Sequence, residues 1–575
     1  MKYALEKIKL NIVKSINQAV GKKIVKASDL ITPPNPQFGD LNLPCFELAK
    51  KIHPPAGGKT AAEMASFLVS KIEAKSIIAG IKPIGPYLNF TINKKYLTKN
   101  VIDEVLREKY KYGKNNSGKS KRVMIEYSNA NTHKEYHVGH LRNICYGDSV
   151  NKILSANGFK SIPVSYINDF GIHVAKTLWC YLEFYKNKEL PKNKGRFLGE
   201  IYSRSTKEIE KNKLAKEKVS FLMKKIESKK GVEYKLWEKT RIWSIEQFNK
   251  IYKELNIKFD HTFYESEFIN KGLREVEKLY KKKFLEKSDG AIIANLEKYD
   301  LGVLLFLRSD GTALYPVADL PLAIEKIKKY KLDKSIYVVD VRQGLYFKQL
   351  FKVLELLGYK QGMEHLVYEF VKLPGGMMSS RSGNVIPYED LRETAMSKAV
   401  RETKERHKDW SAKKVEEVAN KIVNGAIKFE MIKVGANQII NFDIDKALRF
   451  DGFTATYLQY VCARINSIIK KYNANSQINT NTNYANLVDE KENGLIMKLA
   501  KYPEVIKKAG SNYDPSEIAR YLFELAQEFN DYYHNVPVLK ADKEKRDGRI
   551  ILISSISQII KNGLTLLGIS VVDEM

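Results

Sequence analysis

The sequence predicts a multidomain protein: a small α+β unit, an α/β domain with a doubly wound parallel sheet, and an all-helical C-terminal third. Three observations predict this architecture. The 575 residues are too many for one hydrophobic core. Residues 122–167 alternate strand, helix and strand patterns, which is typical of parallel strands joined by a crossover helix. From about residue 390 onward, apolar residues recur at helical spacing almost throughout.

The first unit is expected to span residues 1–112. Its opening helix has one apolar face, and that face carries Leu5, Ile8, Ile12 and Ile16. Helices are also expected at 43–52 and 60–72, after a Pro- and Gly-rich stretch, and alternating apolar residues predict a strand at 88–92. The polar segment 112–121 marks a boundary, because Gly, Asn, Ser and Lys dominate it.

Residues 122–158 organise the rest of the chain. Val123-Met124-Ile125 predicts a buried parallel strand, and a helix is expected to follow it. Gly158 comes after the last apolar residue of that helix and is suited to end it in a left-handed conformation. The loop between the strand and the helix ends in the motif HVGH at 137–140. Amide groups and the helix dipole favour an anion at such a helix start, and the imidazoles could donate to phosphate oxygens. The alternative is that both histidines are helix caps or core residues.

A second strand is expected at 161–167, followed by Asn168-Asp169. Ligands of doubly wound sheets bind beyond the carboxyl ends of the strands, where both this pair and HVGH fall. Asp169 as a helix cap remains an equal alternative. Residues 180–260 are lysine-rich and helical in pattern, which indicates an insertion in the sheet, and Trp237 and Trp243 are expected in its core.

The second half of the α/β domain contains further strand and helix patterns. Apolar β-like runs occur at 290–293 and 302–307, and a buried strand is expected at 336–340. A helix at 346–357 is expected to end before Gly358. Asp319 lies one helical turn after Tyr315, so the two side chains share a face.

Composition limits the compartment and the partners. The net charge of +30 suits a polyanion such as RNA, although a lysine-rich proteome explains it equally well. No apolar run is long enough to cross a bilayer, and the N-terminus lacks a signal-peptide core. Four scattered cysteines without metal-ligand spacing predict a cytoplasmic protein with no structural zinc.

Five motif regions, in order along the chain, resemble one enzyme family. HVGH resembles the HIGH signature of class I aminoacyl-tRNA synthetases, and the wider stretch 126–140 resembles the arginyl-tRNA synthetases. Residues 372–384 resemble the KMSKS loop, with Met377 and Ser380 at the two lysine positions; a plain surface loop is the alternative. The FGD and GPYLNF stretches resemble that family's N-terminal domain, and the resemblance covers nearly the whole chain.

The resemblance implies a class I Rossmann-like catalytic domain that forms arginyl-adenylate from L-arginine and ATP, then transfers arginine to tRNA(Arg). It implies Mg²⁺ with ATP, no membrane and a monomer. Lys134, His137, His140 and Arg381 would be catalytic, with Lys134 replacing a missing KMSKS lysine. The residues implied to bind ATP are His137, Gly139, His140, Met378, Ser379, Ser380 and Arg381.

A guanidinium needs planar, fixed acceptors, and a carboxylate matches its two-pronged geometry. Asp319 is the best candidate, and Glu126 is a second carboxylate. The arginine-binding residues implied by the resemblance are Glu126, Asn129, Asn131, His140, Tyr315, Asp319 and Gln343. Each alone is more often a cap or a surface polar group, but together they favour a site. Family members often carry Thr-Arg where this chain has Val317-Ala318.

The end domains are implied to contact tRNA. Phe38 belongs to the first of them. The run 456–465 resembles the start of a DALR-type anticodon-binding bundle, in which Tyr457, Tyr460 and Arg464 could stack on or contact bases. The aromatic stripe with Phe523 and Phe529 is more typical of a core. The predicted divisions are 1–112, 113–390, a helical stem 391–450 and the bundle 451–575.

Two other interpretations remain open. One is a class I synthetase of another specificity, such as cysteine, which the cysteine spacing and the pair Tyr315 and Asp319 disfavour. The other is a non-catalytic RNA-binding paralogue, which has no need of His137, Gly139 and His140.

Overall fold

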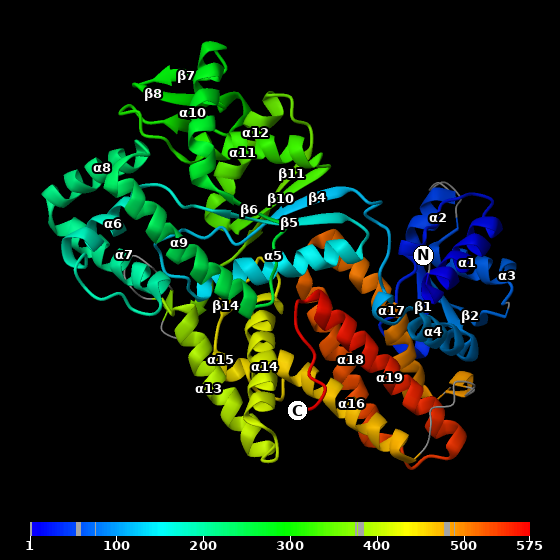
Figure 1. Cartoon of the computed structure of the whole chain (residues 1–575). Coiled ribbons are helices and arrows are strands. Elements are labelled where there is room, and N and C mark those ends of the chain that lie inside the picture. The colour runs from blue at the N-terminus through cyan, green and yellow to red at the C-terminus, as the bar shows by residue number, and fades with distance from the viewer. Residues whose placement is uncertain are drawn as a thin grey trace.

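The computed structural model describes residues 3–575 except 53–58, 75, 374–375, 378–384, 476–483 and 488. A parallel sheet lies at the centre of the molecule (Figure 1). A group of helices flanks it on one side, and the first unit packs beside the last helices of the chain on the other. None of the described helices combines the length and the apolar character that crossing a bilayer requires.

The central sheet contains only parallel pairings in the described part of the chain, in the order β11-β10-β4-β5-β6. Its strands are β4 (Arg122–Glu126), β5 (Lys160–Ile167), β6 (His261–Tyr264), β10 (Lys334–Asp340) and β11 (Gly362–Tyr368). The predicted strands at 123–125, 161–167 and 336–340 are therefore confirmed. Val123 and Ile125 are almost fully buried, as expected where helices cover both faces.

Helix α5 (Val138–Ala156) crosses from β4 to β5, and Gly158 follows it with a φ of 82°. The predicted left-handed helix end is therefore confirmed. Ser149 and Asp148 connect α5 to the C-terminal part of the chain, because the Ser149 hydroxyl donates to the carbonyl of Leu566 over 3.1 Å. The buried Lys428 ammonium lies 3.5 Å from Asp148 and donates to the carbonyl of Gly568 over 2.8 Å.

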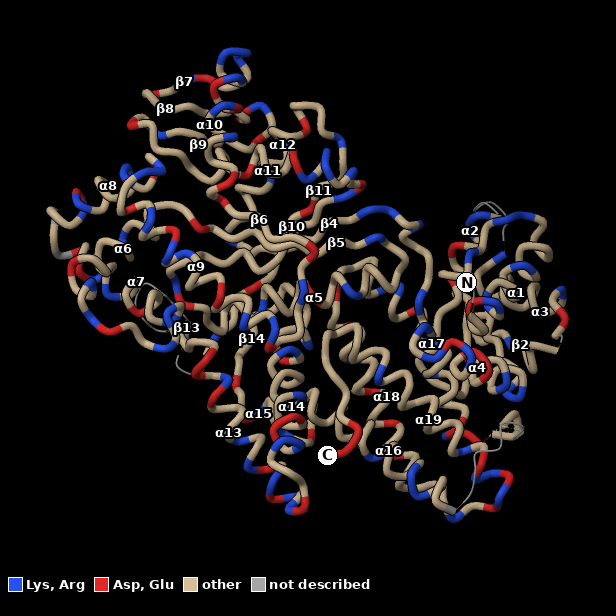
Figure 2. Tube along the Cα trace, in the orientation of Figure 1, with Lys and Arg blue, Asp and Glu red and all other residues tan. Residues whose placement is uncertain are grey.

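The insertion is helical, as predicted. It consists of α6 (Ile172–Phe184), α7 (Lys194–Lys211), α8 (Lys213–Glu227) and α9 (Gly231–Glu254), and the chain then returns to the edge strand β6. Trp237 and Trp243 are 5% and 6% exposed, which confirms that both are core residues. Lys and Arg recur along these helices and along the C-terminal helices, whereas β4, β5 and β10 are mostly uncharged (Figure 2).

The apolar runs at 290–293 and 302–307 contribute to a separate antiparallel sheet of β7 (Glu286–Ser288), β8 (Ala291–Asn295) and β9 (Val303–Leu307). Helices α10 (Glu265–Lys281), α11 (Tyr315–Tyr330) and α12 (Gly344–Leu356) pack between it and the parallel sheet. Gly358, with a φ of 92°, follows α12 as predicted. A Cβ at Gly272 would lie 1.6 Å from the Val317 carbonyl oxygen, so α10 and α11 cross in very close contact.

The first unit contains α1 (Ala4–Ala19), β1 (Leu41–Pro44), α2 (Phe46–Ile52), α3 (Ala61–Lys71), β2 (Ile78–Ile84), β3 (Tyr87–Ile92) and α4 (Lys94–Glu108). The helix predicted at 43–52 is wrong at its start, because Leu43 and Pro44 belong to β1. That strand pairs antiparallel with β3, opposite Phe90 and Leu88. The helix predicted at 60–72 is confirmed, with Thr60 as its N-cap.

The C-terminal third is helical as predicted, apart from the two-residue strand β14 (Ile440–Asn441), which pairs with β12 (Val371–Leu373). Its main helices are α13 (Tyr388–Arg406), α14 (Ala412–Ile432), α16 (Ala455–Asn475), α17 (Glu490–Asn512), α18 (Pro515–Asn535) and α19 (Lys543–Leu566). Helix α16 ends at Asn475, and 476–483 lie outside the described residues. The C-terminal tail packs, because Glu574 pairs with Lys414 and Lys470.

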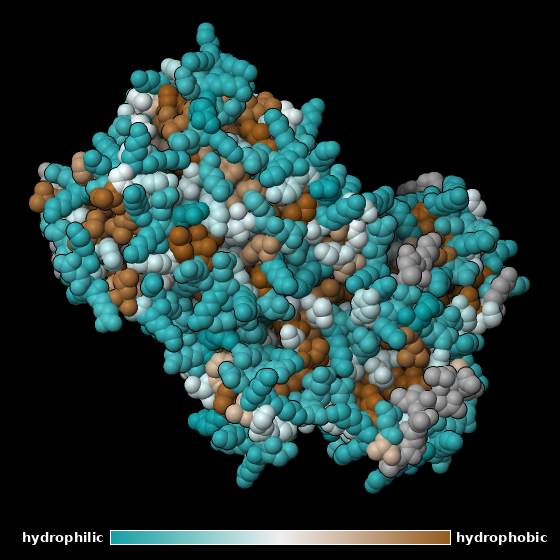
Figure 3. All heavy atoms as spheres, in the orientation of Figure 1, coloured by the Kyte–Doolittle hydropathy of each residue, from teal (hydrophilic) through white to brown (hydrophobic). Residues whose placement is uncertain are grey.

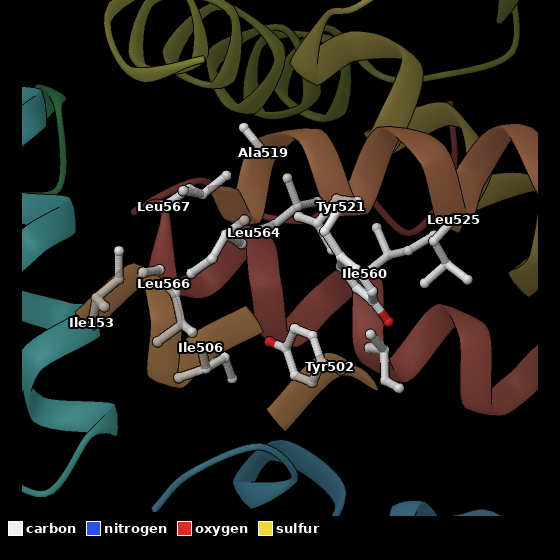
Figure 4. Packing of buried hydrophobic residues seen from close by; sticks show 14 of the residues in the cluster. Ile153, Tyr502, Ile506, Ala519, Tyr521, Leu525, Ile560, Leu564, Leu566 and Leu567 are labelled. Atoms are coloured by element: carbon white, nitrogen blue, oxygen red, sulfur yellow. The ribbon is translucent and has the colours of Figure 1, made fainter. Parts of the chain in front are cut away.

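The core of the last three helices continues onto α5 (Figure 4). Tyr502 and Ile506 of α17, Tyr521 of α18 and Ile560 of α19 pack together, and Ile153 of α5 lies at one end of the group. Phe529 is fully buried, which confirms its core role, whereas Phe523 is only partly buried. On the face shown in Figure 3 the surface is largely hydrophilic, with scattered apolar residues.

Candidate functional site

A cavity of about 300 Å³ opens at the carboxyl ends of β4, β5 and β10, where α11 and α12 face the sheet. Parallel strands bring their carboxyl ends to one edge, so residues from distant segments meet there. Apart from His140, the residues predicted to bind arginine all line this cavity: Glu126, Asn129, Asn131, Tyr315, Asp319 and Gln343. Tyr315 is 60% exposed, which puts it at the mouth.

Glu126, at the end of β4, is 3% exposed. One of its carboxylate oxygens forms a buried ion pair with Lys326 of α11, and the other accepts from the Asn129 amide over 3.3 Å. Both oxygens of this carboxylate are therefore already held by protein groups.

Asp319 differs from Glu126 because one of its oxygens is unsatisfied. Oδ2 accepts a hydrogen bond from the Tyr346 hydroxyl of α12, whereas Oδ1 is buried and has no partner among the described residues. Burial raises the pKa of Asp319 to about 6; the Tyr346 hydrogen bond lowers it and the nearby Glu126 charge raises it. An unsatisfied buried acceptor is unfavourable unless a ligand provides a donor.

Three more lining residues carry buried polar atoms without a hydrogen-bond partner within the described ranges. These atoms are the Asn129 Oδ1 and the hydroxyls of Tyr166 and Tyr337. The Asn129 and Asp319 oxygens are acceptors, whereas each tyrosine hydroxyl can accept and also donate, and the Tyr166 hydroxyl interacts with Asp319 and lowers its pKa. A guanidinium has five N–H donors and no acceptor, so it matches this surface.

The sequence did not reveal Glu265, which opens α10 directly after β6. It is 7% exposed, and the Asn168 amide donates to it over 3.2 Å. Burial and the Asp319 charge raise the pKa of Glu265 to about 8. Its position after a strand was the available signal, but it belongs to no motif. Lys326, Tyr166 and Tyr346 were missed for the same reason.

Asp169 serves as a remote helix cap rather than as a lining residue of the cavity. It is fully buried and accepts from the Ser266 backbone N–H over 2.9 Å and from the Ser266 hydroxyl over 2.8 Å. It also pairs with Arg241 of α9. This carboxylate therefore holds α9 and the start of α10 to the sheet.

The HVGH motif begins α5, and its histidines cap that helix. The Gly139 N–H donates to Nδ1 of His137, and the His137 N–H donates to Nδ1 of His140, each over 3.1 Å. Because both Nδ1 atoms accept, each neutral ring carries its proton on Nε2 and can donate there. Each histidine can therefore cap the helix through Nδ1 and still donate to a phosphate through Nε2.

Both imidazoles are neutral near pH 7. Burial and the neighbouring Lys134 charge lower the pKa of His137 to about 4. Burial, His137 and Lys134 lower the pKa of His140 well below its usual range. The Lys134 charge therefore acts on both rings, and its Nζ lies 5.0 Å from the centre of the Tyr202 ring.

A buried histidine holds the loop that carries Lys134. Nε2 of His133 lies 2.8 Å from the Thr240 hydroxyl of α9, and its backbone N–H donates to the Ser244 hydroxyl over 2.9 Å. Burial lowers the pKa of His133 to about 3, so this contact does not change near pH 7.

The second predicted motif is only partly described. Lys372 and Leu373 lie in β12, but Met378, Ser379, Ser380 and Arg381 lie outside the described residues. The chain that follows docks on the HVGH loop: the Val138 N–H donates to the Ile386 carbonyl over 3.1 Å, and the Tyr388 N–H donates to the Tyr136 carbonyl over 2.9 Å. The two motif regions therefore adjoin.

The predicted RNA contacts lie at the surface. Phe38 is 41% exposed, whereas Tyr457, Tyr460 and Arg464 are partly exposed. Tyr457 and Arg464 are brought together by Asn530, which hydrogen-bonds to both side chains. Tyr460 instead packs edge-on against Phe450. Over the described ranges, no group of three or more His, Cys, Asp or Glu could hold a metal ion.

Three family models match the chain in order. Residues 6–92 match the arginyl tRNA synthetase N terminal domain, residues 101–445 the catalytic domain of class I (R) tRNA synthetases, and residues 458–575 the DALR anticodon binding domain.

Similar proteins span almost the whole chain. An arginine--tRNA ligase of Bdellovibrio bacteriovorus is 36% identical over 558 residues, covering 95% of this chain and 94% of that protein. One from Clostridium acetobutylicum is 34% identical, covering 98% and 99%. The solved Thermus thermophilus arginyl-tRNA synthetase has a TM-score of 0.79 and 25% identity, covering 99% of this chain and all (100%) of that one.

Proposed function

This chain belongs to the class I arginyl-tRNA synthetases and therefore ligates arginine to tRNA, and we propose which of its residues perform each part of that reaction. The cavity at the carboxyl edge of the sheet binds L-arginine. The HVGH loop, Lys134 and Arg381 bind the phosphates of ATP. The other interpretations, a different specificity or a non-catalytic paralogue, are not supported by the matches, which name arginine--tRNA ligases.

The observation that carries the arginine assignment is the unsatisfied Oδ1 of Asp319. A guanidinium could donate to this oxygen while Tyr346 continues to hold Oδ2. Tyr315, at the mouth, would cover the bound side chain with its ring, and Asn129 would offer a second acceptor. Asn131 and Gln343 line the same cavity and would hold the amino-acid end.

The first chemical step is an in-line displacement. The arginine carboxylate oxygen attacks the α-phosphorus of ATP, the bond to the β-phosphate oxygen breaks, and pyrophosphate leaves. Negative charge shifts onto phosphate oxygens, so the Nε2–H groups of His137 and His140 and the ammonium of Lys134 stabilise it. Because these rings are neutral and are held in place by capping α5, they act as fixed donors and not as proton carriers.

In the second step a ribose hydroxyl of the terminal adenosine attacks the adenylate carbonyl, and AMP leaves. We propose that Phe38 contacts the tRNA from the first domain, and that Tyr457, Tyr460 and Arg464 contact the anticodon from the last. The proposed divisions are 1–112, 113–390, 391–450 and 451–575. The hydrogen bonds of Asn530 support the anticodon assignment, since they orient the side chains of Tyr457 and Arg464.

We further propose that the protein is a monomer and that it works in the cytoplasm. The four buried free cysteines support the second point, because they fit a reducing compartment. Mg²⁺ would arrive on the phosphates of ATP. The described residues offer no cluster of metal ligands, so we assign the ion no protein site and no step. Arginine activation is expected to require tRNA, so each exchange assay contains tRNA.

The test is arginine-dependent ATP–pyrophosphate exchange with Asp319→Asn. Loss of the carboxylate leaves the guanidinium unpaired, so the KM for arginine should rise by about a hundredfold or more, while the KM for ATP stays within about twofold. Asp300→Asn is the matched control, because Asp300 is exposed and Asn tolerates its left-handed conformation. An unchanged KM for arginine in Asp319→Asn would exclude the assigned site.

A further inference from the structure

Lys326 is a buried cation on the wall of the cavity, and nothing above assigns it a role. It is 1% exposed and lies on α11, two helical turns after Asp319 and on the same face. Its Nζ pairs with Glu126 and lies 5.0 Å from the ring centre of Phe263, 5.4 Å from that of Tyr337 and 5.7 Å from that of Tyr166. The three rings and Glu126 surround the Lys326 ammonium, so its positive charge is held beside the Glu126 carboxylate.

Lys326 determines the charge balance of the cavity. The lining carboxylates are Glu126, Asp319 and Asp340, and the last is paired with Arg342 over 2.9 Å at the exposed rim. Lys326 neutralises Glu126. Among the described lining residues, one negative charge therefore remains without a cation, and it belongs to Asp319. That charge equals the single positive charge of one guanidinium.

Without Lys326, two carboxylates would share a water-poor site. Neighbouring carboxylates resist simultaneous ionisation, so the pair would take up a proton more readily. Burial raises the pKa of Asp319 and Glu126 raises it further, whereas Lys326 lowers it. A protonated Asp319 cannot form the ion pair that a guanidinium needs.

Other groups face Asp319 from the surrounding elements. Tyr346 of α12 donates to it, Tyr166 of β5 and Tyr337 of β10 offer hydroxyls, and Glu265 of α10 is an acidic neighbour. The tyrosines are neutral near pH 7 because burial raises the pKa of each. Burial and the Asp319 charge raise the pKa of Glu265 to about 8, so Glu265 is mainly protonated at about pH 6, and Lys326 is the cation that favours ionisation of Asp319 there.

We propose that Lys326 is a positioning residue for arginine recognition: by neutralising Glu126, it keeps Asp319 ionised and available to the guanidinium. This inference rests on the proposed arginine site. Arginine binding then depends on the charge balance of the cavity and not on the lysine side chain itself.

The test measures kcat/KM for arginine in the exchange reaction at about pH 6 and about pH 8, with tRNA present. The variants are Lys326→Met, Lys326→Arg, and the matched control Lys329→Met, which changes an exposed lysine of the same helix. A rise of about one unit in the pKa of Asp319 would lower its ionised fraction at about pH 6 roughly fivefold, with little change at about pH 8.

In Lys326→Met the ratio of kcat/KM at the higher pH to that at the lower should therefore increase about fivefold. Lys326→Arg and Lys329→Met should keep the wild-type ratio. The double variant Glu126→Gln/Lys326→Met removes the buried pair together, which avoids an unpaired buried charge and preserves the charge balance. Its ratio should return to wild type even if arginine binds less tightly.

A wild-type ratio in Lys326→Met, or an elevated ratio in the double variant, would overturn the inference. If Lys326→Met does not fold, an elevated ratio in the double variant or in Lys326→Arg still overturns the inference, because both restore the charge balance of the cavity. The Asp319→Asn variant separates the two proposals. If it binds arginine normally, the site itself is wrong; if it loses arginine while Lys326→Met has the wild-type ratio, only the role of Lys326 is wrong.

Discussion

The Tyr346→Phe substitution tests how the arginine-recognising carboxylate is held. The Tyr346 hydroxyl donates to Oδ2 of Asp319, which leaves Oδ1 as the oxygen for the ligand. A hydrogen bond to a charged group contributes about 1.5–3 kcal/mol. If the orientation of Asp319 depends on this bond, removal of the hydroxyl should raise the KM for arginine by about 10-fold to 100-fold.

The assay is arginine-dependent pyrophosphate exchange at saturating ATP, followed by the KM for ATP as an internal control. Tyr359→Phe is the matched variant, since Tyr359 is half-buried and does not line the cavity. The hydrogen bond also lowers the pKa of Asp319, so the defect of Tyr346→Phe should grow as the pH falls toward about 6. A KM for arginine within about twofold of wild type at both pH values would refute this reasoning.

Three further predictions concern catalysis and stability. His140→Ala should lower the rate of arginine activation about 10²-fold to 10³-fold, because it removes a fixed donor, and single-turnover kinetics would measure this; an unchanged rate removes the phosphate role. Lys428→Met should lower the free energy of unfolding by about 1–3 kcal/mol in a denaturant titration, because the Gly568 carbonyl loses its donor and Asp148 keeps only Lys152 as a charged partner; full stability would show that these contacts contribute little. Gly272→Ala should lower the melting temperature, because its Cβ would meet the Val317 carbonyl oxygen at 1.6 Å; an unchanged temperature would mean that α10 moves without penalty.

Local patterns predicted the centre of the fold well. The apolar run at 123–125 is the middle strand β4, and Gly158 ends α5 with a positive φ. The residues that line the cavity were implied by the family resemblance. The sheet explains part of their arrangement, because Glu126 ends β4 and Asn131 follows it, and the ends of parallel strands meet at one edge.

The missed features depend on contacts between distant segments. The sequence predicts a helix from Leu43, but pairing with Leu88 of β3 makes Leu43 a strand residue. Lys326 resembles the other lysines of α11, and only its burial against Glu126 distinguishes it. Glu265 lies far from every motif along the chain, and β6 brings it beside Asn168.

The tautomers of the HVGH histidines also could not be predicted from the sequence. They depend on which ring atom accepts a backbone N–H, and the cap geometry shows that it is Nδ1 in both. The neutral state of His137 follows from burial next to Lys134, which no pattern of residues along the chain reveals.

The most direct test of the account is a structure of the protein bound to a non-hydrolysable arginyl-adenylate analogue. We expect a guanidinium nitrogen at about 3 Å from Oδ1 of Asp319, with the phosphate of the analogue near Nε2 of His140. A guanidinium that binds away from Asp319, or an analogue that leaves the cavity empty, would contradict the account.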